Sequence, residues 1–137
     1  MKHLILVAFI AVFAISCGKT GNAVPNVGVD FEAPLTDPRL SALSISGGSV
    51  IINGYGVEGL IIYHEIDGSY ACYDRCSSYE PQNRCAVTID SDGFTATDPC
   101  SGSRFSLVDG TPVKGPATVA LKSYYVSVVN YEIFVSN

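Results

Sequence analysis

Short apolar runs alternate with turn signals along the chain from about residue 45 to the C-terminus. The runs read "SVIIN", "GLIIYHE", "SYACY", "CAVTID", "FTAT", "ATVALKSYYVSVVN" and "YEIFVSN", and they are rich in the β-branched and aromatic residues that favour strands. No segment has a sustained 3.6-residue period, and Pro34 and Pro38 argue against a long helix before the first run. The pattern predicts one antiparallel all-β domain, a sandwich or a barrel, over residues 31–137.

The N-terminal residues have the pattern of an export signal. Lys2 and His3 precede an uninterrupted apolar run from Leu4 to Ile15, which is shorter than the roughly 20 residues of a membrane-spanning helix and is typical of a signal-peptide core. The following "AISC" resembles the lipobox of bacterial lipoproteins, in which the cysteine is acylated and becomes the mature N-terminus. We therefore expect a signal peptide over residues 1–16 and lipidation at Cys17.

The residues after the predicted lipid cysteine are polar and small. Residues 18–30, "GKTGNAVPNVGVD", contain glycine, asparagine and proline and little apolar mass, so residues 17–30 are expected to form a lipidated N-terminus and flexible tether. The lipid makes the membrane a predicted partner and places the protein in the bacterial cell envelope. Gly18 and Lys19 do not form the acidic retention signal known in some lipoproteins, which favours the outer membrane, facing the periplasm.

Charge and cysteine content narrow the class of protein. The formal net charge is −5, with 8 Lys and Arg against 13 Asp and Glu, and the absence of a basic stripe argues against nucleic-acid binding. If Cys17 carries lipid, four cysteines remain: Cys72, Cys76, Cys85 and Cys100. In an oxidising compartment an even count predicts two disulfides, with three possible connectivities.

Residues 98–121, "DPCSGSRFSLVDGTPVKGPATVAL", resemble the second loop of Rieske [2Fe–2S] domains. That family has Cys-Pro-Cys-His-Gly-Ser-x-Phe, then a glycine, Gly-Pro-Ala and a leucine; this chain keeps Pro99, Cys100, Gly102, Ser103, Phe105, Gly110, Gly115, Pro116, Ala117 and Leu121. Upstream, "ACYDRC" (71–76) occupies the place of the first loop, Cys-x-His-x-x-Cys. The resemblance spans about residues 45–137 and implies a Rieske-like antiparallel β-sandwich with a small two-loop subdomain of the cluster-binding type.

The resemblance also implies that the cluster ligands have been replaced. A Rieske centre needs two cysteines and two histidines, and the four positions fall on Ala71, Tyr73, Asp98 and Ser101. A shifted alignment that uses Cys72 as a ligand and Asp74 in the histidine position still leaves the second loop without a histidine. Because His3 leaves with the signal peptide, His64 is the remaining imidazole, and one histidine cannot supply an iron that needs two. We therefore expect neither a cofactor nor a metal.

A disulfide pairing is implied by the same resemblance. Cys76 and Cys100 match the second pair of loop cysteines, which form a disulfide in cytochrome bc-type Rieske proteins. The resemblance therefore implies Cys76–Cys100, and Cys72–Cys85 follows as the remaining pair.

Other chemistry has weaker support in the sequence. Asp74, Glu80, Asp90 and Asp98 offer oxygen ligands for Ca²⁺ or Mg²⁺, but their spacing matches no ligand loop. Zinc would need reduced cysteines, "CYDRC" is not a CxxC dithiol, and a serine hydrolase would have His64 as its one candidate base. We expect no enzyme activity.

These observations together predict a membrane-anchored lipoprotein whose Rieske-like domain has lost its iron–sulfur cluster and serves as a binding or envelope-structural module. Tyr70, Tyr73 and Tyr79 around the first loop suggest an envelope protein partner at the loop tip. The alternative is a [2Fe–2S] Rieske-type electron-transfer protein with atypical cluster ligation.

Overall fold

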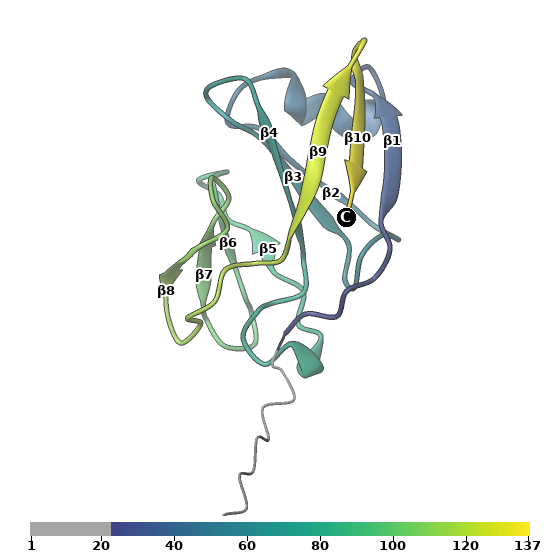
Figure 1. Cartoon of the computed structure of the whole chain (residues 1–137). Helices are drawn as coiled ribbons and strands as arrows, with labels where there is room; N and C mark the ends of the chain where they lie inside the picture. The colour runs from purple at the N-terminus through teal and green to yellow at the C-terminus, as the bar shows by residue number, and fades with distance from the viewer. Residues whose placement is uncertain (1–22) are drawn as a thin grey trace, which may run out of the picture.

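A computed structural model describes residues 23–137, so the predicted signal peptide (1–16) and the predicted lipidation site, Cys17, lie outside the described residues. These residues form ten strands and two short 3₁₀ helices, and Figure 1 labels the strands. The strands are β1 (Asp30–Pro34), β2 (Ser49–Ile52), β3 (Leu60–His64), β4 (Tyr70–Asp74), β5 (Thr88–Ile89), β6 (Thr95–Thr97), β7 (Arg104–Ser106), β8 (Pro112–Lys114), β9 (Ser123–Val129) and β10 (Glu132–Ser136). The helices are η1 (Pro38–Ser44) and η2 (Pro81–Asn83).

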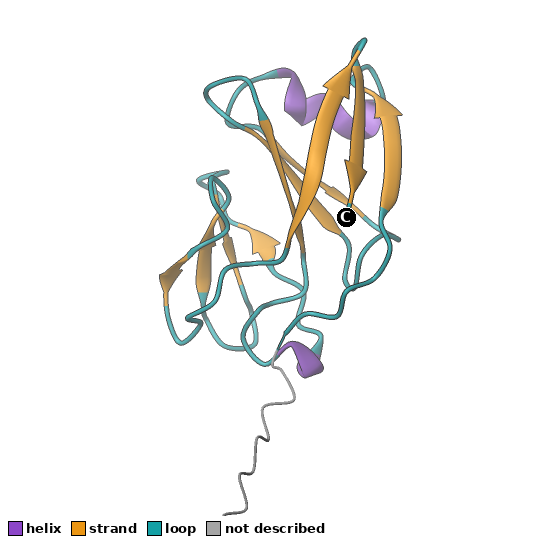
Figure 2. Ribbon diagram, viewed as in Figure 1, coloured by secondary structure: helices purple, strands orange, loops and turns teal. Residues whose placement is uncertain are grey.

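The strands form two antiparallel sheets (Figure 2). The larger has the order β1-β10-β9-β4-β3-β2, and the smaller has the order β5-β6-β7-β8. The smaller sheet comes from one continuous stretch of sequence, inserted between β4 and β9. The predicted antiparallel all-β class is confirmed.

Two apolar cores lie on opposite faces of β3 and β4. Successive side chains of a strand point to opposite faces, and Leu60 and Ile62 accordingly pack in one core while Ile61 and Tyr63 pack in the other. The first core also contains Phe31, Leu40, Leu43, Ile133 and Val135, and the second contains Val87, Phe105, Leu107 and Leu121. A strand buried on both faces reads as an unbroken apolar run, which explains "LIIY".

Five elements were not anticipated from the runs: β1, η1, η2, β7 and β8. The strand β1 ends at Pro34 and alternates exposed and buried residues, with Phe31 and Ala33 inward. The helix η1 begins after Asp37, whose carboxylate accepts a hydrogen bond from the Arg39 backbone N–H at 2.8 Å, and it buries Leu40 and Leu43. The strand β1 and the helix η1 are too short for a periodic pattern to stand out, but they close the first core.

Residues 23–29 precede β1 without helix or strand. Asn26 Oδ1 accepts a hydrogen bond from Lys122 Nζ at 3.0 Å, and the Val29 N–H donates to Asn137 Oδ1 at 3.0 Å. Val29 is buried in the first core, so this part of the segment is attached to the domain. Across residues 23–137, none of the helices has the length and apolar character needed to cross a bilayer.

Candidate functional site

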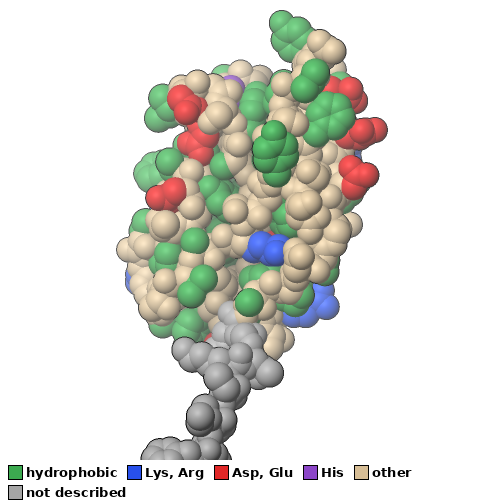
Figure 3. Space-filling model, in the orientation of Figure 1, with side chains coloured by type: hydrophobic (Ala, Val, Ile, Leu, Met, Phe, Trp, Pro, Cys, Tyr) green, Lys and Arg blue, Asp and Glu red, His purple; other side chains and the backbone are tan. Residues whose placement is uncertain are grey.

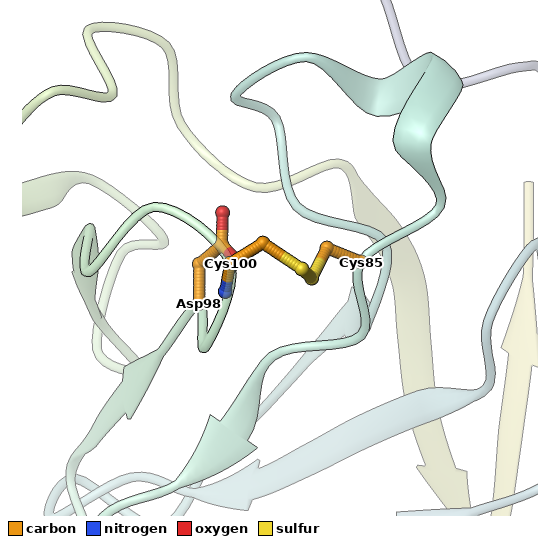
Figure 4. Close-up of side chains that lie close together, drawn as sticks. All are labelled: Cys85, Asp98 and Cys100. Carbon is orange, nitrogen blue, oxygen red and sulfur yellow. A yellow bond between two sulfur atoms is a disulfide. The ribbon is translucent and has the colours of Figure 1, made fainter.

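Two loops meet at one end of the small sheet. We call residues 75–87, between β4 and β5, the first loop, and residues 98–103, between β6 and β7, the second loop. The first loop contains η2, which is flanked by Glu80 and Arg84 in the left-handed region, at φ of 48° and 51°. Figure 4 shows that a disulfide joins the two loops beside Asp98.

The disulfide links Cys85 to Cys100, with 6.3 Å between the two Cα atoms. Cys72 and Cys76 are both buried and carry free thiols. The predicted pairs Cys76–Cys100 and Cys72–Cys85 are therefore wrong. Cys100 does clamp the second loop to the first, but through the cysteine at the far end of the first loop.

Strand geometry explains the error. Cys72 lies within β4 and points into the first core, whereas its neighbours Ala71 and Tyr73 face the second core. Its sulfur is therefore embedded among apolar side chains rather than at the loops. Cys76 forms an isolated β-bridge with Ala86. Because side chains alternate along extended backbone, the residue before Ala86, Cys85, points away from Cys76, and its sulfur reaches Cys100.

Asp98 is the centre of a hydrogen-bond network between the loops. Its Oδ2 accepts from Ser77 Oγ of the first loop and from Ser101 Oγ of its own loop, both at 2.7 Å. Its Oδ1 accepts from the Cys100 N–H at 2.8 Å and from the Ser101 N–H at 3.4 Å. The residue is 1% exposed, so its carboxylate takes its hydrogen bonds from these four protein donors instead of from water.

These donors set the ionisation of Asp98. Burial opposes the charged form, but the hydrogen bonds from Ser101, Ser77 and the backbone outweigh it and hold the pKa of the Asp98 carboxyl below its ordinary value. The charged carboxylate therefore persists at neutral pH inside the site.

A third segment covers the network. Ser103 Oγ accepts a hydrogen bond from the Ala117 N–H at 2.9 Å and lies 2.9 Å from Ser101 Oγ. Ser78 Oγ of the first loop donates to the Val119 carbonyl. The chain that follows β8 is thus tied to both loops.

A second buried carboxylate lies at the base of the first loop. Asp74, the last residue of β4, is fully buried and accepts hydrogen bonds from the Val57 N–H at 2.7 Å, the Cys76 N–H at 2.8 Å and Tyr124 Oη at 2.7 Å. These bonds join the β2–β3 loop, the first loop and β9 to one side chain. Asp74 was considered from sequence only as a metal ligand, and nothing in the sequence separates a buried aspartate from an exposed one.

The sequence-predicted positions separate into two groups. Asp98 and Ser101 lie together in the network. Ala71 and Tyr73 lie in β4, where Tyr73 packs in the second core against Gly110. Neither residue hydrogen-bonds to Asp98. The first-loop residue that does is Ser77, which sequence reasoning missed because a serine beside a turn carries no distinguishing signal.

The loops enclose a small polar hollow of about 270 Å³. It is lined by Tyr79, Glu80, Asn83, Cys85, Asp98, Cys100, Ser101 and Pro116. Within residues 23–137, ligand atoms of Cys85, Asp98 and Cys100 come within 4.8 Å of one another. Both sulfurs belong to the disulfide, and metal ligation requires thiolates, so this group cannot ligate a metal in its oxidised form.

The free thiols are poor ligands as well. Burial, followed by the negative charge of Asp74, raises the pKa of Cys76 to about 11, and burial likewise raises the pKa of Cys72. Both thiols are therefore protonated at neutral pH.

His64 is distant from the loops along its strand. It is the last residue of β3, whereas Leu60 at the other end pairs with Asp74 beside the first loop. Its ring stacks on Tyr70, with 4.5 Å between centroids, and Nδ1 lies 2.8 Å from the Leu43 carbonyl. The imidazole thus has a structural position near η1.

No protein-family profile matches the chain, and no curated protein matches it. Solved structures do. The cyanobacterial plasma membrane Rieske protein PetC3 from Synechocystis PCC 6803 aligns with a TM-score of 0.56 at 20% identity, over 82% of this chain and 100% of that one. The fold is Rieske-like. A chain from the complex of reduced oxygenase and oxidized ferredoxin in carbazole 1,9a-dioxygenase aligns with a TM-score of 0.52 at 22% identity, over 79% of this chain and 93% of that one. The Sphingomonas yanoikuyae B1 ferredoxin has a TM-score of 0.52 at 18% identity, over 70% and 93%.

Proposed function

We propose that this protein is a lipid-anchored envelope module in which a disulfide and a carboxylate-centred hydrogen-bond network hold the two Rieske-like loops in place of an iron–sulfur cluster. On this proposal the domain transfers no electrons and acts as a binding or structural module. The observation that carries it is Asp98, which stands where the family has a cysteine ligand and is satisfied by four donors from both loops.

The donor chemistry supports the loss of the cluster. A Rieske iron that is held by two histidines needs two imidazoles at the loops, and among the described residues His64 is the one imidazole, at the far end of β3. The first loop offers no histidine in either register. If its Cys-x-His pattern is read from Ala71, the third position is Tyr73; if it is read from Cys72, the third position is Asp74.

The network also explains how loops without a cluster stay in place. In a Rieske protein the metal–ligand bonds tie the two loops together. Here the Cys85–Cys100 disulfide and the Ser77–Asp98 hydrogen bond make the same two-loop connection, and Ser103 and Ser78 add the segment that contains Ala117 and Val119. Every described buried side-chain nitrogen and oxygen has a hydrogen-bond partner, which supports the proposal that the network itself holds the loops.

The predicted anchor gives the module its location. Ala23, Pro25 and Val27 line a cavity of about 450 Å³ together with Pro81, Gln82 and Arg84 of the first loop. The N-terminal segment therefore leaves the domain beside the loops (Figure 1). With lipid on Cys17, the loop end of the domain is the end nearer the membrane, and a partner at the loop tip is an envelope or membrane component.

Metal analysis tests the proposal. The full chain is produced anaerobically beside a Rieske protein that is purified the same way, and iron, acid-labile sulfide and visible absorption are measured on both. We expect the control to contain two irons per chain and this protein to contain neither iron nor sulfide in stoichiometric amounts. Two irons per chain with visible absorption would overturn the proposal and establish the electron-transfer alternative.

A further inference from the structure

The strands β4 and β9 pair over only two residues. Cys72 is opposite Tyr124 and Tyr73 is opposite Ser123, yet β9 continues to Val129. Figure 1 shows the two strands diverging toward the β9–β10 turn. From Tyr125 to Val129, the side of β9 that faces away from β10 has no partner strand in the described part of the chain.

The backbone groups along this edge can be assigned. The Lys122 carbonyl accepts from the Asp74 N–H at 2.8 Å, and Tyr124 pairs with Cys72, so the even-numbered residues direct their backbone groups toward β4. The β9–β10 turn agrees with this assignment. Its two residues, Asn130 and Tyr131, lie between the paired Val129 and Glu132, and such a closing pair exchanges both hydrogen bonds across the hairpin. The odd-numbered residues of β9 therefore direct their backbone groups toward β10. The N–H and C=O groups of Val126 and Val128 therefore face the open side, where a new strand would pair.

A groove lies against the same edge. Its volume is about 390 Å³, and it is lined on one side by Gly68, Ser69 and Tyr70 and on the other by Leu35, Val126, Ser127, Val128 and Tyr131. The side chains of an incoming extended segment would alternate between this groove and solvent. The groove is therefore placed to receive apolar side chains from such a segment.

The edge lacks the protection that exposed strands usually carry. Proteins block free edges with lysine, proline or a bulge, whereas Ser123–Val129 reads "SYYVSVV", without charge or proline. Tyr125 is 69% exposed and Tyr131 is 81% exposed, and Tyr131 also adopts a left-handed φ of 62°, which is rare for a bulky residue. Clustered exposed apolar residues on an open edge are typical of an interaction surface.

Negative charge surrounds the groove. Glu65 and Asp67 lie in the β3–β4 turn next to Gly68 and Ser69, and Glu132 follows Tyr131. The described ion pairs involve Asp37, Glu58, Asp90 and Asp92, so these three carboxylates have no cationic partner among residues 23–137. Figure 3 shows acidic side chains on both sides of the hydrophobic group at this end.

We propose that an extended segment of a partner protein adds to β9 as a further strand, with apolar side chains in the groove and Lys or Arg beside Glu65 and Asp67. Backbone pairing at Val126 and Val128 would supply affinity, and the groove and the carboxylates would supply specificity. This surface lies at the end of the domain opposite the loops and the N-terminal segment (Figure 1), so it does not depend on the state of the loop site.

The test uses the full chain purified in detergent and three fluorescent peptides. The first is acetyl-GKVKVKVKG-amide, the second replaces each Lys with Glu, and the third replaces the central Val with Pro. Anisotropy should show binding of the Lys peptide and about tenfold or greater loss of affinity for each of the other two, a change of at least about 1.4 kcal/mol. Amide exchange at Val126 and Val128 should slow by about tenfold or more in the complex, because those N–H groups become hydrogen-bonded.

Two variants and their matched controls separate this surface from general stickiness. Val128→Lys should abolish binding of the Lys peptide, whereas its control Val113→Lys, on the exposed strand β8, should leave binding unchanged. Glu65→Lys should weaken binding of the same peptide, whereas its control Glu32→Lys, on β1, should not. Thermal unfolding verifies that each variant is folded. Equal binding by the Lys and Glu peptides, or by wild type and Val128→Lys, would overturn the proposal. Self-association of the wild type that Val128→Lys abolishes would also overturn it, in favour of a second copy of this chain as the occupant.

Discussion

Ser77 of the first loop donates a hydrogen bond of 2.7 Å to the Asp98 carboxylate of the second loop. The two residues are 21 positions apart in sequence, and both are buried. A short bond to a buried carboxylate is charge-assisted and stronger than a neutral one. This contact and the Cys85–Cys100 disulfide hold the loops by independent means, which makes each separately testable.

Replacing Asp98 should destabilise the domain in a pH-dependent way. Asp98→Asn removes the charge and places an amide donor against donors, so at about pH 7 we expect a loss of about 1.5–3 kcal/mol in the free energy of unfolding. Because the folded pKa lies below the unfolded value, the contribution of the charge is present above the unfolded pKa of about 3.9 and is lost as the pH falls through the folded pKa.

Urea unfolding at neutral pH and at about pH 2.5 measures this difference. Asp109→Asn serves as the control, since Asp109 also has a lowered pKa, from hydrogen bonds with Thr111, but lies in an exposed turn. A deficit for Asp98→Asn no larger than that of Asp109→Asn, or one of equal size at both pH values, would contradict a central role for the buried charge.

The disulfide should be found between Cys85 and Cys100, and its removal should cost stability. Peptide mapping without reduction should recover this pair, with Cys72 and Cys76 alkylated only after unfolding because both are buried. The Cys85→Ser/Cys100→Ser double variant should lose about 3 kcal/mol in the chain-entropy account of a loop of this size. The Cys72→Ala variant is the control for the mapping and should keep the Cys85–Cys100 peptide. A Cys76–Cys100 peptide from the folded wild type would refute the assignment.

Gly56 should tolerate no side chain, because of its contact with Asp74. Its φ is +66°, and a Cβ there would overlap Asp74 Oδ2. Gly54 is the matched control, with φ of +88° and open space around the corresponding Cβ. Gly54→Ala should cost about 1–2 kcal/mol from backbone strain alone, and Gly56→Ala should exceed it by more than about 1 kcal/mol. Chemical denaturation of both variants decides the matter: equal losses would mean that Asp74 moves aside freely.

Cys17 should carry the lipid. Metabolic labelling with an acyl-chain analogue should mark the wild-type chain and not Cys17→Ser, because acylation needs that thiol. The full-length Cys72→Ser variant controls for labelling at a buried cysteine. Label retained on Cys17→Ser would mean that the N-terminal run is an ordinary secretory signal.

The sequence alone predicted most of the strands and the second loop. Alternation and turn residues are local, so "SVIIN", "GLIIYHE" and "YEIFVSN" were recognisable as strands, and they appear as β2, β3 and β10. Asp98 and Ser101 were predicted to lie in the second loop, and they are hydrogen-bonded there because they are three residues apart in one tight turn. Short elements such as β7 and β8 were missed, since three residues carry no periodic signal.

The tertiary structure alone decided the first loop and the pairing of the cysteines. A shift of one residue along a strand reverses the face that a side chain occupies. The position at which β4 ends therefore determines that Cys72 is in a core, that Cys76 faces Ala86 and that Cys85 reaches Cys100. The tertiary structure also decided that Ser77 contacts Asp98. It likewise decided that β9 has an open edge, because β9 and β4 pair over only two residues. These relationships depend on how separate strands pack together, and local sequence patterns do not encode that packing.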